Sequence, residues 1–553
     1  MASLKFIAIS GTTGVTENCY LYEYGDDMIM VDCGVGFPEP EMYGVDLVIP
    51  DFTYVKQNAR KLKGIVITHG HEDHLGALPF LFKDLRVPIY ASKLVAGFIE
   101  DKFVDYKTEK NMTPKIHVFD PQKDTITLGV FKVTPFRVTH SVPDSCGLCI
   151  DTPEGKLFHV PDYKFDWTPV EEKPFDIKKA AILASGDVLC VASDCLGANS
   201  PGYTESEKEI ENRIEAIVAK AKGAVAFTTI SSNISRMQQA LRVAHRLGRS
   251  VVFVGRSIDR KAEIARRLGY LHYPSKLVIP ARHAKKMPDN KLMYIVSGSY
   301  GQPGSALYRV ALGEHKFLEI GSGDTVIFSA DPAPPGSKTN VDFLVDRFIQ
   351  LGVDVHYYDI QEDLHVSGHG SIEDIKMLLS IFRPKYCVPI GGTIRHMKAY
   401  ADLAQSVGIE KGNVLTLSAG EVVEFRQGQA SVREKIPVKS VLVDGLGVGD
   451  VGNVVLRDRQ TLAKDGIAIA IIQFDMVKQK LNNTPEVLSR GFVYEAREKD
   501  LLRRAGEDLK IFIEKRNRID KVLVKDLSVE FLEKFFYQKT GRRPMVLPLI
   551  VEV

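Results

Sequence analysis

Residues 65–74 of the chain read IVITHGHEDH, an apolar strand that runs into three histidines and an aspartate. On an extended segment, side chains two positions apart project to the same side, so His69 and His71 can hold one metal ion. Asp73 and His74 fall where the chain turns into the next expected helix, and they can reach a second ion. Because a solvated loop rarely gathers four such side chains at this spacing, the stretch predicts a dinuclear metal site. Zinc and manganese both suit these residue types.

Two further strand ends, in RVTHSVPDS and LFHVPDYKFD, carry His140 and Asp162. A lone histidine after a strand is more often an ordinary core or surface residue, and only the metal loop makes these two candidates. Asp162 can bridge both ions, an arrangement that commonly activates water at neutral pH. Asp32, which ends the strand MIMVD, either supports a ligand histidine from behind or is a turn residue before Gly34.

The order of apolar and polar runs divides the chain into parts. Short strand-like runs end in polar loops up to about residue 205, and the same style resumes at His365 in HVSGHGSIEDIKMLLSIFRPKYCVPIGG. Between them, helical patterns alternate with apolar strands, which is typical of an α/β unit inserted into the first domain. We expect a discontinuous first domain at 1–205 and 365–435, an insertion at 206–364, a linker at 436–455 and a C-terminal domain at 456–553.

Composition excludes several classes of protein. The 553 residues exceed what one core supports, and 44% hydrophobic with 26% charged residues is typical of a folded globular chain. A net charge of +2 means that a nucleic acid would need a local basic surface. Seven cysteines without a signal peptide indicate a reducing cytoplasm, and we expect Cys146 and Cys149 to pack in the core. No apolar run is long enough to cross a membrane.

Several motifs together resemble one known family. HGHEDH, THSVPDS and PDYKFD resemble the metal motifs of the metallo-β-lactamase fold. The stretches SDCLGANSPGYTESE, ISSNISRMQQ, SGSYGQPGSALYR, HVSGHGS, DGLGVGDVGN and GRRPMVLPLIVEV narrow the resemblance to the β-CASP nucleases and to the ribonuclease J family, over nearly the whole chain. This resemblance implies an α/β fold: a metallo-β-lactamase αββα sandwich with an inserted β-CASP α/β domain and a small α+β C-terminal domain.

The resemblance also implies an activity. Such a chain would be a metal-dependent ribonuclease of RNA processing and decay that acts on single-stranded RNA. It would cut RNA internally and degrade it in the 5′-to-3′ direction, with a preference for a 5′-monophosphate. It would need two divalent metal ions, zinc or manganese. Its partners would be RNA, a second copy of itself in a homodimer or homotetramer, and RNA-decay proteins in the cytoplasm, with no membrane.

Residue roles carry over position by position. One ion would be held by His69, His71 and His140, the other by Asp73 and His74, with Asp162 bridging and Asp73 also counted as catalytic. Asp194 and His369 match the family's catalytic pair, in which the histidine donates a proton to the leaving 3′-oxygen. The residues that would receive a nucleotide's phosphate are Ser232, Asn233, His365, Ser367, Gly368 and His369. HVSGH can at the same time be the loop before a helix capped by Ser371.

The chain departs from the family pattern at two positions. Gly391 stands where the family has a histidine that completes the second metal site, so that site would rest on fewer ligands and bind its ion more weakly. His396 lies close enough in sequence to be a replacement ligand. Pro161 stands where the family usually has glycine before Asp162.

These features leave alternatives open. Gly391 favours a catalytically weakened RNA-binding subunit that partners an active homologue. A small-molecule metallohydrolase of the glyoxalase kind would share the metal loop, but it would not explain the inserted and C-terminal domains. A cluster of basic residues could contact RNA phosphates or be a solvated helix face: Arg256, Arg260, Lys261, Arg266 and Arg267.

Overall fold

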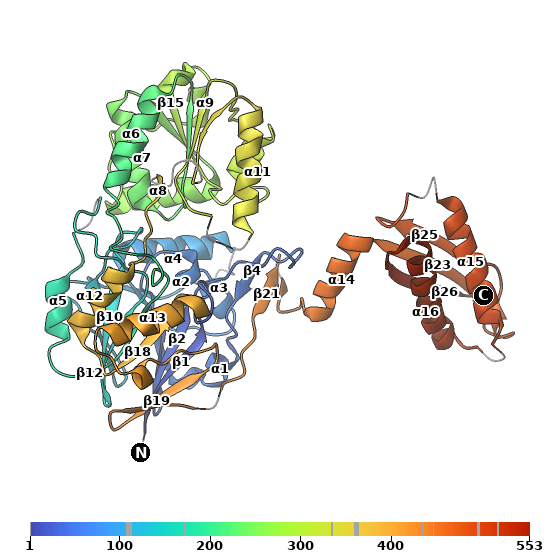
Figure 1. Cartoon of the computed structure of the whole chain (residues 1–553), viewed down its shortest axis with the longest axis horizontal. Coiled ribbons are helices and arrows are strands. Elements are labelled where there is room, and N and C mark those ends of the chain that lie inside the picture. The colour runs from blue at the N-terminus through green and yellow to red at the C-terminus, as the bar shows by residue number, and fades with distance from the viewer. Residues whose placement is uncertain are drawn as a thin grey trace. The chain divides into compact units, whose positions relative to one another are not determined.

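The protein is described by a computed structural model, in which residues 2–106, 113–170, 173–332, 334, 336–358, 364–433, 435–445, 447–494, 498–516 and 519–553 are described. The chain forms two compact units, Met1–Phe37 with Leu47–Val441 and Pro38–Asp46 with Leu442–Val553. Figure 1 shows the course of the chain through both.

An eight-stranded sheet forms one half of the sandwich in the first unit, in the order β20-β19-β1-β2-β3-β5-β6-β7. Its strands are β1 (Leu4–Ser10), β2 (Cys19–Tyr24), β3 (Asp27–Val31), β5 (Leu62–Val66), β6 (Ile89–Ala91), β7 (Ile116–Val118), β19 (Val422–Arg426) and β20 (Gln429–Val432). Strand β5 is parallel to β3 and β6, so the loops that follow β3 and β5 leave the sheet at the same edge. Asp32 and the metal loop therefore meet there.

A six-stranded sheet forms the other half, in the order β18-β12-β11-β10-β9-β8. Its strands are β8 (Ile126–Leu128), β9 (Phe131–Arg137), β10 (Cys146–Thr152), β11 (Gly155–Val160), β12 (Val188–Asp194) and β18 (Tyr386–Ile390). Strands β11, β12 and β18 are mutually parallel, and so their carboxyl ends lie at one edge. That edge carries Asp162, Asp194 and Gly391.

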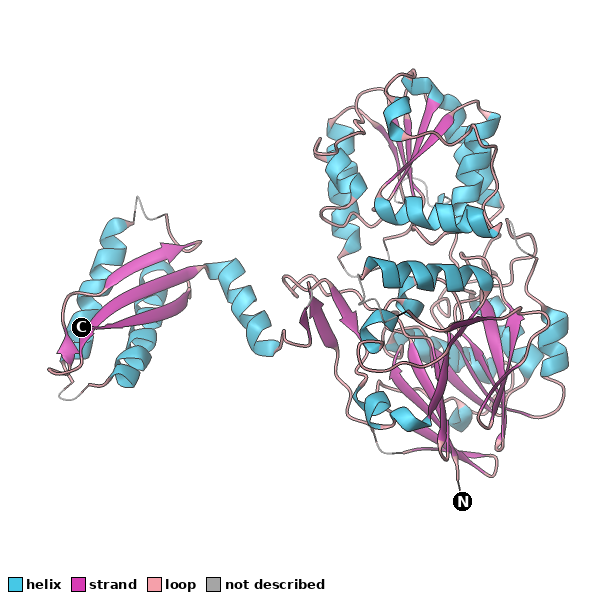
Figure 2. Cartoon of the chain, turned by 180° about the vertical axis from the view of Figure 1, so that it is seen from behind, coloured by secondary structure: helices cyan, strands magenta, loops and turns pink. Residues whose placement is uncertain are grey.

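The two sheets bury a shared core between them. Alternate side chains of each strand face the other sheet, and Phe6, Tyr20 and Val66 of the first meet Phe131 and Leu148 of the second. Helices cover the outer faces, as Figure 2 shows. The helices of this part are α1 (Thr53–Gln57), α2 (Glu72–Leu75), α3 (Leu78–Leu81), α4 (Lys93–Asp105), α5 (Ile177–Leu183), α12 (Ile372–Phe382) and α13 (Ile394–Ser406). The short strand β4 (Leu47–Ile49) and the 3-10 helices η1 (Ala59–Lys61) and η4 (Lys411–Asn413) lie in its loops. The expected αββα sandwich is confirmed.

A second sheet system is inserted between β12 and β18. Five parallel strands in the order β14-β15-β13-β16-β17 pack between helices around a separate apolar core. Its elements are α6 (Glu209–Lys220), β13 (Val225–Thr228), α7 (Ile234–Arg246), β14 (Ser250–Val254), α8 (Arg256–Leu268), α9 (Ala281–Ala284), η2 (Asp289–Lys291), β15 (Leu292–Val296), α10 (Ala306–Ala311), β16 (Thr325–Phe328), α11 (Ser337–Gln350) and β17 (Asp354–His356).

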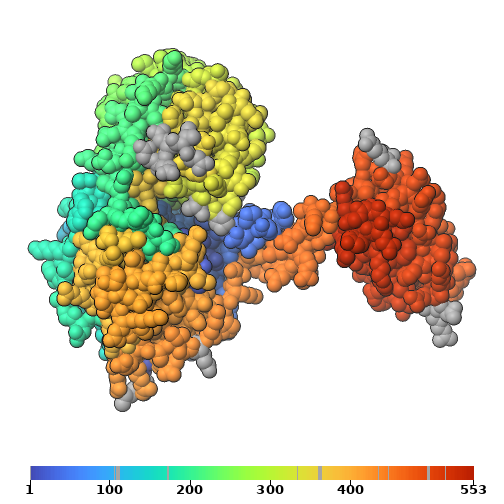
Figure 3. Space-filling view, viewed as in Figure 1, coloured from blue at the N-terminus to red at the C-terminus, as the bar shows by residue number. Residues whose placement is uncertain are grey.

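The returning chain completes the sandwich. Strand β18 adds beside β12, and α12 packs on the outer face of the second sheet, where Phe382 stacks on Phe158 with ring centroids 4.2 Å apart. In the space-filling view the gold surface of this segment adjoins the teal surface of the chain before the insertion (Figure 3). The return brings His369 to a metal loop that lies about three hundred positions earlier in the sequence.

The second unit holds the C-terminal domain. Its elements are β21 (Val441–Asp444), β22 (Gly447–Val448), α14 (Asn453–Asp465), β23 (Ile467–Asp475), β24 (Lys480–Leu481), β25 (Glu486–Arg490), α15 (Lys499–Glu514), α16 (Lys521–Thr540) and β26 (Met545–Glu552). Every second residue of β23 is buried, in a core to which α15 and α16 contribute. This is the small α+β domain that the resemblance implied.

The structure also bears on the state of the cysteines and on membrane-spanning helices. Cys146 and Cys149 both lie in β10 and enter different apolar clusters, so they pack in the core as expected. All seven cysteines are buried and outside disulfides. Within the described residues, no helix combines the length and the apolar character that crossing a membrane requires.

Candidate metal centre

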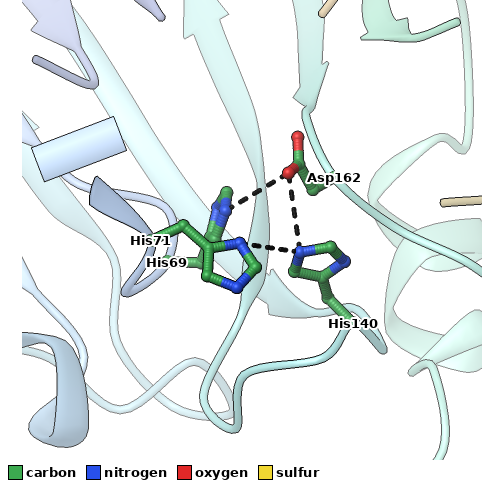
Figure 4. A group of neighbouring side chains, drawn as sticks. All are labelled: His69, His71, His140 and Asp162. Carbon is green, nitrogen blue, oxygen red and sulfur yellow. Dashed lines mark hydrogen bonds and ion pairs between the residues drawn. The ribbon is translucent and has the colours of Figure 1, made fainter. Parts of the chain in front are cut away.

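The first ligand cluster contains His69, His71, His140 and Asp162, and one ligand atom of each lies within 4.8 Å of the others (Figure 4). Asp162 Oδ2 is 3.4 Å from His69 Nε2 and 3.5 Å from His140 Nε2. His71 Nδ1 lies 3.1 Å from His140 Nε2. Three imidazoles and one carboxylate around a common point are a donor set that suits zinc.

Neighbouring groups aim these imidazoles into the cluster. His140 donates from Nδ1 to the carbonyl of Gly368 at 2.7 Å, which leaves its Nε2 lone pair for an ion. Only glycine fits at 368, because a Cβ there would lie 2.5 Å from His140 Cε1. His69 Nε2 is buried without a hydrogen-bond partner. Such an orphaned atom costs free energy unless something binds it, so the residues fit a metal ion.

The second ligand cluster contains Asp73, His74 and Asp162. His74 Nε2 lies 3.4 Å from Asp162 Oδ1 and 3.6 Å from Asp73 Oδ2. Asp162 therefore presents Oδ2 to the first cluster and Oδ1 to the second. Burial raises the pKa of Asp162, but His74, His369 and His69 outweigh it and hold that pKa well below its usual value.

Asp32 supports the second cluster from behind. Its carboxylate is fully buried and accepts hydrogen bonds from His74 Nδ1 at 2.7 Å and from the Thr68 backbone N–H and hydroxyl at 2.8 Å each. The bond to His74 fixes the ring so that Nε2 faces the cluster. Asp32 also has φ +61°, a conformation that Asp and Asn tolerate better than most residues. Both interpretations of Asp32 from the sequence therefore have a counterpart in the structure.

Asp194 and His369 form a pair beside the bridging carboxylate. His369 Nδ1 is 2.7 Å from Asp194 Oδ2, and its Nε2 is 3.9 Å from Asp162 Oδ2. Burial lowers the pKa of His369, but the carboxylates of Asp194 and Asp162 outweigh it and raise that pKa to about 9. The ring is consequently an imidazolium at neutral pH and can donate a proton.

The residues expected to bind phosphate lie around this loop and at the start of α7. Ser367 is exposed, and its hydroxyl accepts from the His369 backbone N–H at 3.1 Å. His365 Nε2 lies 3.7 Å from Asp331 Oδ2, while its Nδ1 is buried without a partner. Burial is the main cause that lowers the pKa of His365 to about 4. His365 is therefore a neutral ring at neutral pH.

Ser232 and Asn233 are both buried, and they precede α7. The Asn233 side chain accepts from the Arg236 backbone N–H at 2.9 Å and so caps the helix. That bond uses its oxygen and leaves its amide hydrogens for other partners.

The structure also places Gly391 and Pro161, which depart from the family pattern, and His396, the candidate replacement ligand. Gly391 follows β18 with φ +68°, and the only atom near a Cβ built there is Asp194 Oδ1 at 3.6 Å. His396 Nδ1 accepts from the Thr393 backbone N–H at 3.2 Å and caps α13. In the described chain His396 joins no ligand cluster, so the replacement-ligand hypothesis is wrong in this geometry. Pro161 leaves Asp162 in both clusters.

Two residues of the predicted basic surface form ion pairs within the protein. Lys261 of α8 is buried and lies 3.3 Å from Glu72 Oε1 of the metal loop, while Arg260 pairs with Asp101 of α4. Burial raises the pKa of Glu72, but Lys102 and Lys261 outweigh it and lower that pKa to about 2. For Lys261 the solvated face was the wrong expectation, because this lysine is buried and pairs the insertion with the metal loop, while an RNA contact of this cluster stays a prediction.

Sequence reasoning missed one polar side chain altogether. Asn18 lies 2% exposed beside His74 and Asp73, immediately before β2. A single asparagine before an apolar strand carries no motif, so only the fold indicates its importance.

Models of four protein families match successive parts of the chain. They are the metallo-beta-lactamase superfamily at 12–181, the ribonuclease J beta-CASP domain at 222–348, the Zn-dependent metallo-hydrolase RNA specificity domain at 354–414 and the ribonuclease J C-terminal domain at 454–553. A crystal structure of an Enterococcus faecalis V583 protein of unknown function matches the fold, with TM-score 0.54, 16% identity, and coverage of 76% of this chain and 100% of that chain. Fold and ligand clusters together define a metal-dependent hydrolase of the metallo-β-lactamase class.

Relatives in other organisms narrow this class. The chain is 36% identical to Ribonuclease J2 of Bacillus subtilis, over 100% of this chain and 99% of that protein. It is 36% identical to Ribonuclease J 1 of Streptococcus pyogenes, over 98% and 97% of the two chains, and 35% identical to Ribonuclease J 2 of Staphylococcus aureus, over 100% and 98%. The chain belongs to the ribonuclease J family. The resemblance read from its motifs is confirmed, and its class is that of a metal-dependent ribonuclease.

Proposed function

We propose that this chain hydrolyses single-stranded RNA at a two-metal centre, in RNA processing and decay in the cytoplasm. It cuts RNA internally and also degrades it in the 5′-to-3′ direction from a 5′-monophosphate end. One observation carries the proposal: the two oxygens of Asp162 face different ligand clusters, and His369 lies within 3.9 Å of the same carboxylate.

The ligand residues divide between two divalent ions, zinc or manganese. His69, His71 and His140 would hold one ion and Asp73 and His74 the other, and Asp162 belongs to both clusters. Ions bound there would supply a nucleophile derived from water and would neutralise charge on the scissile phosphate. Asp32 keeps His74 in the ligand orientation. Gly391 adds no side chain, so we expect the second ion to bind more weakly than an imidazole-completed site would allow.

His369 and Asp194 act on the leaving group. The imidazolium of His369 donates its Nε2 proton to the departing 3′-oxygen, and Asp194 orients the ring through Nδ1. Asp194 is consequently a positioning residue, and its charge keeps the donor protonated.

The loop around Ser367 binds the 5′ end. A phosphate would be received by His365, Ser367, Gly368 and His369 with Ser232 and Asn233 of the insertion, and this set, one nucleotide from the metals, would have limited room and charge capacity. The test compares RNAs with a 5′-monophosphate and a 5′-triphosphate, in manganese, magnesium and zinc, with all products mapped. We expect exonucleolysis to favour the monophosphate and internal cleavage to be indifferent, and Ser367→Ala to weaken the preference. Equal processive degradation of both RNAs would refute the pocket.

Gly391 supports a second candidate function, an RNA-binding subunit with little catalysis that assembles with an active homologue and other RNA-decay proteins. We also expect the chain to form a homodimer or homotetramer, and light scattering measures that assembly. Purified protein at saturating metal discriminates between the two functions. Cleavage that Asp162→Ala abolishes supports the enzyme, whereas tight RNA binding without cleavage supports the subunit.

A further inference from the structure

Asn18 lies against the second ligand cluster. Its side-chain Nδ2 is 3.0 Å from His74 Nε2 and 3.4 Å from Asp73 Oδ2. Its backbone is held at both ends: the N–H donates to the Asp73 carbonyl at 3.0 Å, and the carbonyl accepts from Gly34 N–H at 2.9 Å. The backbone of Asn18 is therefore a fixed part of the metal loop's surroundings, and its side-chain amide is held beside the second cluster.

The spacing of these atoms is that of ligands around one ion. Donors bound tetrahedrally at about 2.0–2.1 Å from a common ion lie about 3.3–3.4 Å from one another. In the structure, His74 Nε2 is 3.4 Å from Asp162 Oδ1 and 3.6 Å from Asp73 Oδ2. Asn18 Nδ2 hydrogen-bonds to two of these atoms at 3.0 and 3.4 Å, and the amide oxygen, turned into the place of Nδ2, would extend the same set.

We infer that the carboxamide oxygen of Asn18 is the fourth protein ligand of the second metal site, in the role that Gly391 leaves open, and that this site is consequently less selective for zinc over manganese than the first. This inference rests on the proposed two-metal centre. It adds a ligand to that centre and makes its two halves differ in metal selectivity.

Hydrogen bonding allows the amide to turn its oxygen toward the ion. The Tyr20 hydroxyl lies 2.8 Å from Asn18 Oδ1 and 2.8 Å from the Gly11 carbonyl, yet its single hydrogen serves one acceptor at a time. After a half turn of the amide, Asn18 Nδ2 donates to the Tyr20 oxygen and Tyr20 donates to Gly11, while the Val15 carbonyl loses its 3.4 Å contact with Nδ2. The amide oxygen then lies beside His74 Nε2 and Asp73 Oδ2, where a cation would be needed to hold these acceptor atoms together.

The Gly11 carbonyl connects this arrangement to the missing ligand. Gly11 also accepts from the Gly391 backbone N–H at 2.9 Å, so Gly391, Gly11, Tyr20 and Asn18 form one chain of contacts. Gly391 has no side chain that could reach the metal centre. Asn18, at the other end of this series of contacts, does reach the ligand cluster.

The two ligand sets then differ in chemistry. The first has three imidazole nitrogens and one carboxylate, which suit zinc. The second has one imidazole, two carboxylates and one amide oxygen. Oxygen ligands favour manganese and magnesium relative to nitrogen ligands, so the second site should discriminate less strongly between zinc and manganese than the first.

The experiment measures metal content of the full-length protein without RNA. Metal-free protein is equilibrated with zinc and with manganese in separate titrations, and bound metal is quantified by elemental analysis and by chelator competition. We expect wild type to bind two ions of either metal, with a smaller difference between zinc and manganese affinity at the second site than at the first. Asn18→Ala should keep the first ion and bind the second 10–100-fold more weakly, whereas Asn18→Asp, which keeps an oxygen at the same place, should bind it at least as tightly as wild type.

Asn58→Ala is the matched control, because among the described contacts the Asn58 side chain donates only to the Tyr54 carbonyl, and it belongs to neither ligand cluster. Unfolding midpoints of the metal-free proteins establish that each variant is folded. If Asn18→Ala does not fold, weaker binding in Asn18→Asp overturns the inference. Unchanged second-metal affinity in folded Asn18→Ala also overturns it while leaving the ribonuclease proposal intact. If wild type binds no metal, both proposals are wrong.

Discussion

Replacing Asp32 by Asn tests whether this buried carboxylate controls the second metal through His74. Asparagine keeps the size of the side chain and tolerates the φ of +61° found at this position. It removes the negative charge and places N–H donors where His74 Nδ1 and Thr68 already donate. His74 then loses the acceptor that fixes its ring.

The contacts set the expected size of the effect. Hydrogen bonds to a charged group contribute about 1.5–3 kcal/mol each, and breaking one side of a buried charged pair costs about 3–5 kcal/mol. We therefore expect Asp32→Asn to lower the free energy of unfolding of metal-free protein by about 2–4 kcal/mol. Losing the partner of a ligand histidine typically weakens metal affinity by about 10–100-fold, which corresponds to about 1.4–2.8 kcal/mol.

Two assays separate structural damage from an effect on the metal. Guanidinium unfolding with a chelator present gives stability, and chelator competition gives the affinity of each metal. Exposed Asp26→Asn, on the neighbouring turn, is the control. In a His74→Ala background, Asp32→Asn should change second-metal affinity much less. Reduced stability with unchanged second-metal affinity would refute the reasoning and leave Asp32 a purely structural residue.

Three other substitutions examine the rest of the centre. Asp162→Ala should remove bound metal from both clusters and abolish RNA cleavage, and full activity in this variant would rule out the bridging role. His369→Asn should slow cleavage about 10²–10⁴-fold at unchanged metal content. The wild-type rate should fall as pH rises through the His369 pKa, and the variant should lack this fall. A variant that keeps the same fall in rate at high pH would exclude His369 as the proton donor. Gly391→His should cost about 1–2 kcal/mol of stability, because φ is +68° there, and should shift the second site toward zinc; an unchanged metal preference would show that residue 391 does not reach the ion.

The fold class and the residues of the candidate ligand clusters could be predicted from sequence because the determining patterns are local. A metal ion requires nitrogen and oxygen donors, and the loop at 69–74 supplies them within one short stretch. Parallel strands deliver their carboxyl ends to one edge, so the positions of His140 and Asp162 at strand ends are enough to make them candidates. The insertion could also be predicted, because its alternating helical and strand patterns differ from the short strand-like runs on either side of it. The domain boundaries and the catalytic and binding roles stay predictions.

Tertiary structure alone decided the partners of those ligands. Gly368 orients His140 across 228 positions, Asp32 orients His74 across 42, and Lys261 reaches Glu72 across 189. His396 turned away to cap a helix, and Asn18 came to the ligand cluster without any motif. Ligand type is a chemical requirement that a short segment can express by itself. Which buried group receives each remaining hydrogen bond depends on how distant strands and helices pack, because only packing brings those atoms within reach of one another.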